Sequence, residues 1–286
     1  MARPSLAARL IAPRRIALAD TRARALAGDV EAVHRARVAS RRLREVLPVV
    51  AGPGGRPARH AVRAVTRALG PVRELDVCAG LFGPFAAAAA LTPAAAAVLQ
   101  RALASARASA LQRARTRLHP AQWRRLDTAL DEVLASPPVD RHDVGARAAT
   151  RVTRRAAALA DALDHLGTLY SPTRLHAVRV AVKQLRYALE IAGELRLAAT
   201  AADRKTLRAA QDLLGEAHDL HVLAGLVRRT GTRAIGRSRA TARELRRLAS
   251  SLDDRCRALH GDFLARRAGV AAVAARRSAR PGSQDL

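Results

Sequence analysis

The sequence predicts an all-helical protein built from two similar halves. Alanine, leucine and arginine, all strong helix formers, dominate the 286 residues, and alternation of β-branched or aromatic residues is scarce. Helix-ending signals recur between segments long enough for several turns each. A motif in residues 33–47 also returns in residues 175–189. Together these observations predict helical bundles with short connections, formed by an internal duplication.

Glycine, proline and short polar residues mark the breaks between the expected helices. The breaks fall at Gly28-Asp29, residues 52–55, Thr92-Pro93, His119-Pro120, residues 136–138 and Ser171-Pro172. The stretch that begins at Pro137-Pro138 and runs to about Asp143 is the best linker between the halves. We therefore expect a first half at residues 1–138, a second half at residues 139–270 and a disordered basic tail at residues 271–286.

The duplication is indicated by two motifs in the same order. Residues 33–47 read VHRARVASRRLREVL and residues 175–189 read LHAVRVAVKQLRYAL, so that His34 aligns with His176 at an offset of 142. Residues 69–77 read LGPVRELDV and residues 214–222 read LGEAHDLHV, at an offset of 145. Two ordered matches at nearly one offset predict a duplicated helical unit whose halves meet near residue 140.

Each copy of the first motif has one basic and one apolar side when drawn as a helix. The basic sides hold His34, Arg37, Arg41 and Arg44 in the first copy, and His176, Arg179, Lys183 and Arg186 in the second. Four such side chains share about 15 Å of helix, where like charges repel one another. A polyanion would relieve this repulsion, because the planar arginine fork binds phosphate oxygens through two parallel hydrogen bonds. The alternative is an ordinary solvated face of an arginine-rich helix.

The charge balance also indicates an anionic partner. Lysine and arginine total 51 against 24 aspartates and glutamates, a formal charge of +27. Biased genome composition would explain arginine in place of lysine, but it does not explain the excess of cations over anions. Aromatic residues make up only 2% of the chain, too few for the base stacking typical of single-stranded nucleic-acid binders. The composition therefore favours a ligand recognised through its phosphates.

No catalytic constellation is found, and we expect a protein that is not an enzyme and needs no cofactor. The chain has no Walker-type loop, no Gly-x-Ser-x-Gly, no zincin motif and no alternating Glu-x-Glu-x-Lys strand. His218 and His221 have the spacing of metal ligands on a helix. Because Arg73 and Asp76 occupy the matching positions of the first half, no metal site is expected.

The second motif permits two interpretations equally well. Arg73 and His218 could contact phosphate, with Glu74 and Asp219 orienting them, or the same residues could form structural salt bridges. Gly70 and Gly215 would allow close helix packing or a kink.

The remaining features suggest a cytoplasmic protein without membrane insertion. Cys78 and Cys256 lie far apart, as expected of reduced thiols. Basic residues and a proline interrupt the apolar residues near the N-terminus, so no signal peptide is expected. The longest apolar stretch, residues 81–91, contains a Gly-Pro pair and is too short to span a bilayer.

On these motifs, the chain resembles the CHAD family, the conserved histidine α-helical domain. The resemblance rests on the His34 and His176 helices and on the two Leu-Gly-x-x-basic-acidic segments, and it covers roughly residues 5 to 268. Residues 118–135 also resemble the helix that closes the first half of the family's domain. Gln184 and His218 depart from the family, which commonly has a basic residue and an arginine there. These departures predict less charge, or a more pH-dependent charge, in the second half.

The resemblance implies two four-helix bundles, related by a pseudo-two-fold axis, with a basic central groove or pore. It implies binding of inorganic polyphosphate and association with polyphosphate granules. Carried over by position, the ligand-binding residues are His34, Arg37, Arg41, Arg42, Arg44 and Arg73, followed by His176, Arg179, Lys183, Arg186 and His218. Many relatives carry an N-terminal triphosphate-tunnel domain, and its signature is missing here, so a free-standing binder is expected.

Two other functions compete with polyphosphate binding. One is a nucleic-acid-binding or nucleoid-associated protein, whose affinity would also fall with salt. The other is a cytosolic phosphohydrolase acting on short polyphosphates. For a specific site, reversing the charges of Arg37 and Arg179 should weaken binding far more than reversing Arg276 and Arg277, which we expect to be peripheral.

Overall fold

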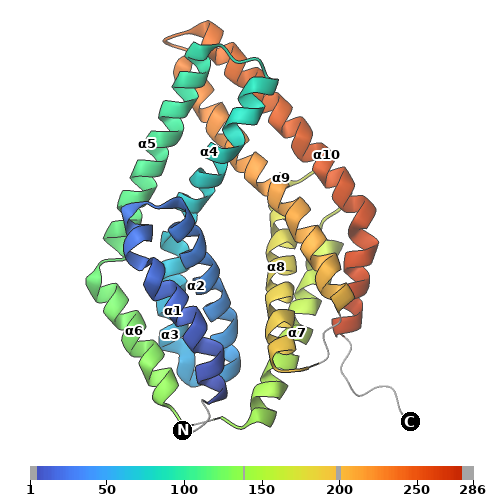
Figure 1. Ribbon diagram of the computed structural model, residues 1–286. Helices are drawn as coiled ribbons and strands as arrows, with labels where there is room; N and C mark the ends of the chain where they lie inside the picture. Colours follow the sequence, from blue (N-terminus) through green and yellow to red (C-terminus); the bar gives the residue numbers. More distant parts are fainter. Residues whose placement is uncertain (1–4, 138, 198–200, 279–286) are drawn as a thin grey trace.

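The computed structural model describes residues 5–137, 139–197 and 201–278, and within them it contains helices and no strand (Figure 1). The prediction of an all-helical fold is confirmed. No helix in this part of the chain is both long enough and apolar enough to cross a bilayer. The helices are α1 (Leu6–Ala27), α2 (Val30–Val50), a 3-10 helix (Gly52–Gly55), α3 (Arg56–Ala68), α4 (Gly70–Ala88), α5 (Pro93–Arg117), α6 (Pro120–Ala135), α7 (Arg141–Asp164), α8 (Pro172–Glu194), α9 (Ala201–Ala234) and α10 (Arg239–Ser278).

The predicted breaks coincide with helix ends because the residues there satisfy free backbone groups. Gly28 ends α1 in the left-handed conformation, with a φ of 101°, and its N–H donates to carbonyls of the last turn. The Asp29 side chain then accepts the N–H of Ala32 at 2.7 Å and begins α2. Thr92 and Ser171 accept backbone N–H groups in the same way at the starts of α5 and α8.

Two hydrophobic cores hold the helices, and each core takes residues from both halves of the sequence. The first joins α1, α2, α3 and α6 to the start of α7, through Val144 and Ala148. The second core is formed by the helices α7, α8, α9 and α10 together with residues of α4 and α5, among them Phe82 and Leu99. In Figure 1, α4 and α5 extend away from the first bundle to meet α9 and α10. The predicted boundary between residues 138 and 139 therefore divides the helices along the sequence, but the two halves do not have separate hydrophobic cores.

The two halves place their helices in a similar order. Helix α2 packs against α1 and α3, and α8 packs against α7 and α9. Where the first half has α3 and α4, the second has the single 34-residue helix α9. Pro71, which lacks a backbone N–H, stands at the beginning of α4, and its counterpart Glu216 allows α9 to continue. The duplication itself stays a prediction.

The end of α10 corrects the predicted tail. The prediction of disorder from residue 271 is wrong for residues 271–278, which continue α10. Val273 and Ala274 are buried, with 1% and 0% of their surface exposed, so the apolar side of the helix remains packed. Residues 279–286 lie outside the described residues.

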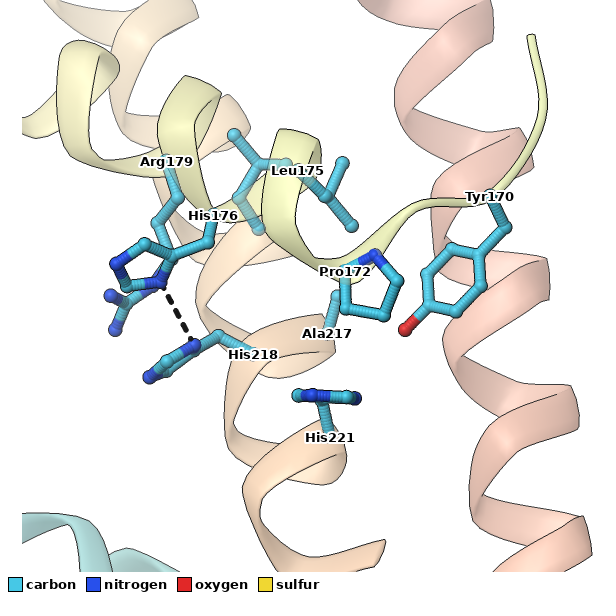
Figure 2. Close-up of a pocket in the computed structure, with 9 residues that line it drawn as sticks. Tyr170, Pro172, Leu175, His176, Arg179, Ala217, His218 and His221 are labelled. Carbon is cyan, nitrogen blue, oxygen red and sulfur yellow. Dashed lines mark hydrogen bonds between the residues drawn. The ribbon is translucent and has the colours of Figure 1, made fainter. Parts of the chain in front are cut away.

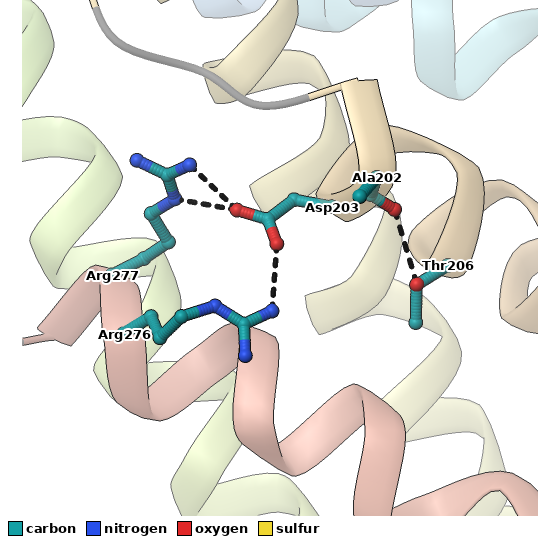
Figure 3. Close-up of polar contacts among 5 residues, drawn as sticks. All are labelled: Ala202, Asp203, Thr206, Arg276 and Arg277. Carbon is teal, nitrogen blue, oxygen red and sulfur yellow. Dashed lines mark hydrogen bonds and ion pairs between the residues drawn. The ribbon is translucent and has the colours of Figure 1, made fainter.

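Arg276 and Arg277, expected to be peripheral to the binding site, form structural ion pairs at the end of α10. Both bind Asp203 of α9, which is only 2% exposed (Figure 3). Arg276 Nη2 donates to one carboxylate oxygen at 2.7 Å, and Arg277 Nε donates to the other at 2.8 Å. Charge reversal at these arginines would leave a buried carboxylate facing a like charge. They are therefore unsuitable as a control for electrostatic binding.

Candidate anion-binding site

Helices α2 and α8 bring the two predicted basic faces together. Their apolar sides are buried in the cores, as Val33 and Leu43 illustrate for α2, and Val178 and Leu185 for α8. This burial fixes the rotation of each helix, so that the basic side faces away from its core. Helices α2 and α8 lie in the middle of the molecule (Figure 1). Because α2 also contacts α8, charges on the two basic sides act on one another.

Five cations drawn from both halves form what we call the cation cluster. It consists of Arg37, Arg41 and Arg73 of the first half, and Arg179 and Lys183 of the second. Burial, followed by the charge of Arg41, lowers the pKa of Arg37 to about 10. Burial also lowers the pKa of Lys183 to about 7, and the charges of Arg179, Arg41 and Arg37 add to the shift. Cations from the two halves thus repel one another.

The acidic residues of the second motif lie beside this cluster. Burial raises the pKa of Glu74 and of Asp219, while the charge of Arg179 opposes the rise in both. Glu74 keeps an exposed surface, so its burial is only partial. Among the ion pairs found in the described residues, none joins either carboxylate to a cation of the cluster. Glu74 and Asp219 thus lower the positive potential of the cluster without forming ion pairs with its cations.

Three guanidinium groups of the cluster have unused donors. The Nε atoms of Arg37, Arg41 and Arg179 are buried and have no hydrogen-bond partner. Leaving a buried donor unsatisfied costs about 1–3 kcal/mol. Arg37 is held in place by its Nη1, which donates to the carbonyl of Thr66 at 2.9 Å. An anion bound at the cluster would offset the mutual repulsion of these guanidinium groups.

Gly70 makes room for one of these arginines. A Cβ at this position would lie 3.1 Å from Nη1 of Arg37, closer than ordinary contact. A Cβ at Gly215 would meet nothing within 4 Å, so close packing explains the first glycine and not the second.

Histidines border the cluster in both halves. The Nδ1 atoms of His176 and His218 are 3.3 Å apart (Figure 2). Burial, and then the charge of Arg179, lowers the pKa of His218 to about 3 and also lowers that of His176. In the first half, burial and the charge of Arg73 lower the pKa of His34. Neutral histidines at pH 7 supply hydrogen-bond donors here without adding positive charge.

A small pocket beside His176 and His218 is visible in Figure 2. Its lining also includes Tyr170, Arg179 and His221. Among the described residues, no group of three or more side chains is placed to hold a metal ion. The observed arrangement offers ring N–H groups and a guanidinium, which suit an anion.

Three predicted ligand residues lie apart from the cluster or are engaged elsewhere. Arg42 is exposed. Arg44 lies near Arg63, Arg67 and Arg151, whose charges, after burial, lower its pKa. Arg186 pairs with Glu190, and its Nε donates to Oε1 of Gln211 at 2.8 Å. The cluster and its border therefore include the other predicted residues: His34, Arg37, Arg41, Arg73, His176, Arg179, Lys183 and His218.

Arg155 of α7 is a neighbour of the cluster that the repeat did not reveal. Its Nη1 donates at 2.7 Å to Oε1 of Gln184, the residue that stands where the family commonly has a basic side chain. A cation from α7 thus lies next to the position that lacks one. Because α7 carries no part of either motif, only the spacing of Arg151 and Arg155, one helical turn apart, could have indicated this role.

The fold and the site define an all-helical protein in which cations from both halves of the sequence converge in one cluster. The CHAD domain model matches residues 9–228, and the chain belongs to the CHAD family. The fold is similar to that of PptA from Streptomyces chartreusis, with a TM-score of 0.67 and 18% identity over 92% of this chain and 99% of that one. It is also similar to the CHAD domain from the plant Ricinus communis, with a TM-score of 0.61 and 20% identity over 94% of this chain and 88% of that one. A comparison with curated proteins found no match.

Proposed function

We propose that this protein binds inorganic polyphosphate at the cation cluster and does not act on it chemically. The observation that carries the proposal is the convergence of Arg37, Arg41, Arg73, Arg179 and Lys183 from both halves, none of which forms an ion pair with a carboxylate among the described residues. Membership of the CHAD family supports the same ligand class.

Capture would depend on several phosphates binding at once. A linear polyphosphate presents closely spaced anionic oxygens, which matches cations repeated at each turn of α2 and α8. Each phosphate that binds a guanidinium satisfies its donors and lowers the repulsion on its neighbours. The uncharged histidines add directional hydrogen bonds at the edges of the cluster. The same chemistry would place the protein at polyphosphate granules.

A competition titration tests the choice of polyanion. Labelled long-chain polyphosphate is titrated with the protein, and duplex DNA is then added at equal phosphate equivalents. We expect sub-micromolar polyphosphate binding that weakens steeply with salt and resists displacement by DNA. Displacement by DNA at low phosphate equivalents would identify a nucleic-acid binder instead.

A second measurement tests for catalysis. The protein is incubated with tripolyphosphate and Mg²⁺ or Mn²⁺, and free phosphate is followed over time. We expect no release above the level without protein. Sustained release that depends on the metal would establish a phosphohydrolase and refute the non-catalytic part of the proposal.

A further inference from the structure

Beyond the cation cluster, α2 continues into a second group of arginines. Arg44 follows Arg41 by one turn on the same face of the helix. Helices α3 and α7 both pack against α2 at this end and bring further arginines close to Arg44. We call this group the flanking patch, and it consists of Arg44, Arg63, Arg67, Arg151, Arg154 and Arg155.

One carboxylate lies among these arginines. Glu45, whose side chain is 8% exposed, accepts from Nε of Arg151 at 2.8 Å and lies 3.7 Å from Nη2 of Arg155. Arg63, Arg67 and Arg154 are exposed, and no ion pair found in the described residues involves them. The flanking patch therefore has a large surplus of positive charge directed at solvent.

Arg155 links the flanking patch to the cation cluster. Its Nη1 binds Gln184, which directly follows Lys183 of the cluster. Its Nε is buried and has no hydrogen-bond partner, as is true of three arginines of the cluster. The contact with Gln184 therefore places the flanking patch beside the part of α8 that carries Lys183.

The other end of the site has only part of this extension, since Arg208 alone corresponds to an exposed arginine of the flanking patch, Arg63. The counterpart of Arg44 in α8 is Arg186, which is occupied by Glu190 and Gln211. Tyr187 and Asp212 stand where the first half has Glu45 and Arg67. The cationic surface is therefore asymmetric, although the two helix faces that form its centre are similar.

We propose that a long polyphosphate chain leaves the cation cluster in one direction only, across the flanking patch. This inference rests on the proposed function. Short chains fill the cluster, while longer chains also bind Arg63 and Arg67. The flanking patch would then set the preference of the protein for chain length.

Two matched double variants test this inference. One is Arg63→Glu with Arg67→Glu in the flanking patch. The other is Arg204→Glu with Arg208→Glu, which reverses two exposed arginines at the same four-residue spacing on α9. Arg208 corresponds to Arg63 at the offset of the second motif, so the control removes equal charge from the equivalent helix of the other half.

Affinity is measured for polyphosphates of defined length, from tripolyphosphate upward, at several salt concentrations. For the flanking-patch variant we expect long-chain affinity to fall roughly tenfold or more, and the salt slope to fall by about one per phosphate-binding arginine. Its tripolyphosphate affinity should equal that of the control variant.

Two results would overturn the inference while leaving the proposed function intact. One is equal long-chain affinity for the two variants. The other is an equal loss for tripolyphosphate and for long chains in the flanking-patch variant, which would make the patch part of the short-chain site. Failure of the unmodified protein to bind any polyphosphate would overturn the proposed function as well.

Discussion

At the scale of single residues, the site combines cations with a buried environment that disfavours their charge. Lys183 is the clearest case, because burial and the charges of Arg179, Arg41 and Arg37 bring its pKa from 10.5 to about 7. The neighbouring charge of Asp219 opposes this shift. In the ligand-free protein the charged form of Lys183 is therefore unfavourable, and a bound anion would stabilise it.

Replacing Lys183 with methionine should stabilise the ligand-free protein and weaken polyphosphate binding. The pKa of Lys183 is lower in the folded protein than in the unfolded chain, so the unfolded chain binds the proton first as the pH falls from 10.5 to about 7. The unmodified protein therefore loses stability over this range, whereas the methionine variant does not. The stabilisation should therefore grow over that range and stay constant below it, reaching about 1 kcal/mol or more at pH 6. Urea unfolding at pH 6 and pH 10 measures the difference. Lys205→Met, at an exposed position on α9, is the matched control and should change little.

Lys183 should also make binding depend on pH. Bound phosphate raises the pKa of Lys183 above its ligand-free value of about 7, so binding above pH 7 requires uptake of a proton. Affinity should fall as the pH rises from 7 to 9. In Lys183→Arg this part of the pH dependence should disappear, because arginine keeps its charge. An unchanged pH profile in Lys183→Arg would exclude Lys183 as its source.

At the scale of helices, the end of α10 depends on Asp203. Asp203→Ala should lower the free energy of unfolding by about 1–3 kcal/mol, because both guanidinium groups lose a buried acceptor. Hydrogen exchange should accelerate over residues 270–278, with polyphosphate affinity unchanged. Asp254→Ala removes an exposed pair with Arg257 and should cost less than about 0.5 kcal/mol. Equal effects of the two substitutions would remove the structural role assigned to Asp203.

The sequence predicted the helix ends that residues such as Gly28, Asp29 and Ser171 form locally. It missed the breaks between α3 and α4, between α8 and α9, and between α9 and α10. It also predicted which side of α2 and α8 would be basic, because the 3.6-residue period separates apolar from charged positions. Arg155 was missed, because its contact with Gln184 depends on how α7 lies against α8. Arg186 was included in the site, because its sequence position does not reveal the competing contacts of Glu190 and Gln211.

At the scale of the whole molecule, the shared cores predict a single unfolding transition. Trp123, the one tryptophan of the chain, is buried in the first core and reports on that core alone. Its fluorescence and the far-ultraviolet circular dichroism, which reports on all helices, should change at the same urea concentration. A tryptophan transition clearly separated from the helical one would show that the cores unfold independently.

The most direct test of the central claim is long-chain polyphosphate binding by a charge-reversed cluster. Arg37→Glu with Arg179→Glu should lower affinity about 100-fold or more, since several charge-assisted hydrogen bonds are lost and repulsion is added. Arg101→Glu with Arg113→Glu, two exposed residues of α5, changes the net charge equally and should lower affinity less than about tenfold, because salt screens distant charges. Circular dichroism verifies that both variants are folded. Equal losses from the two variants would contradict a specific site and leave only nonspecific attraction to a basic protein.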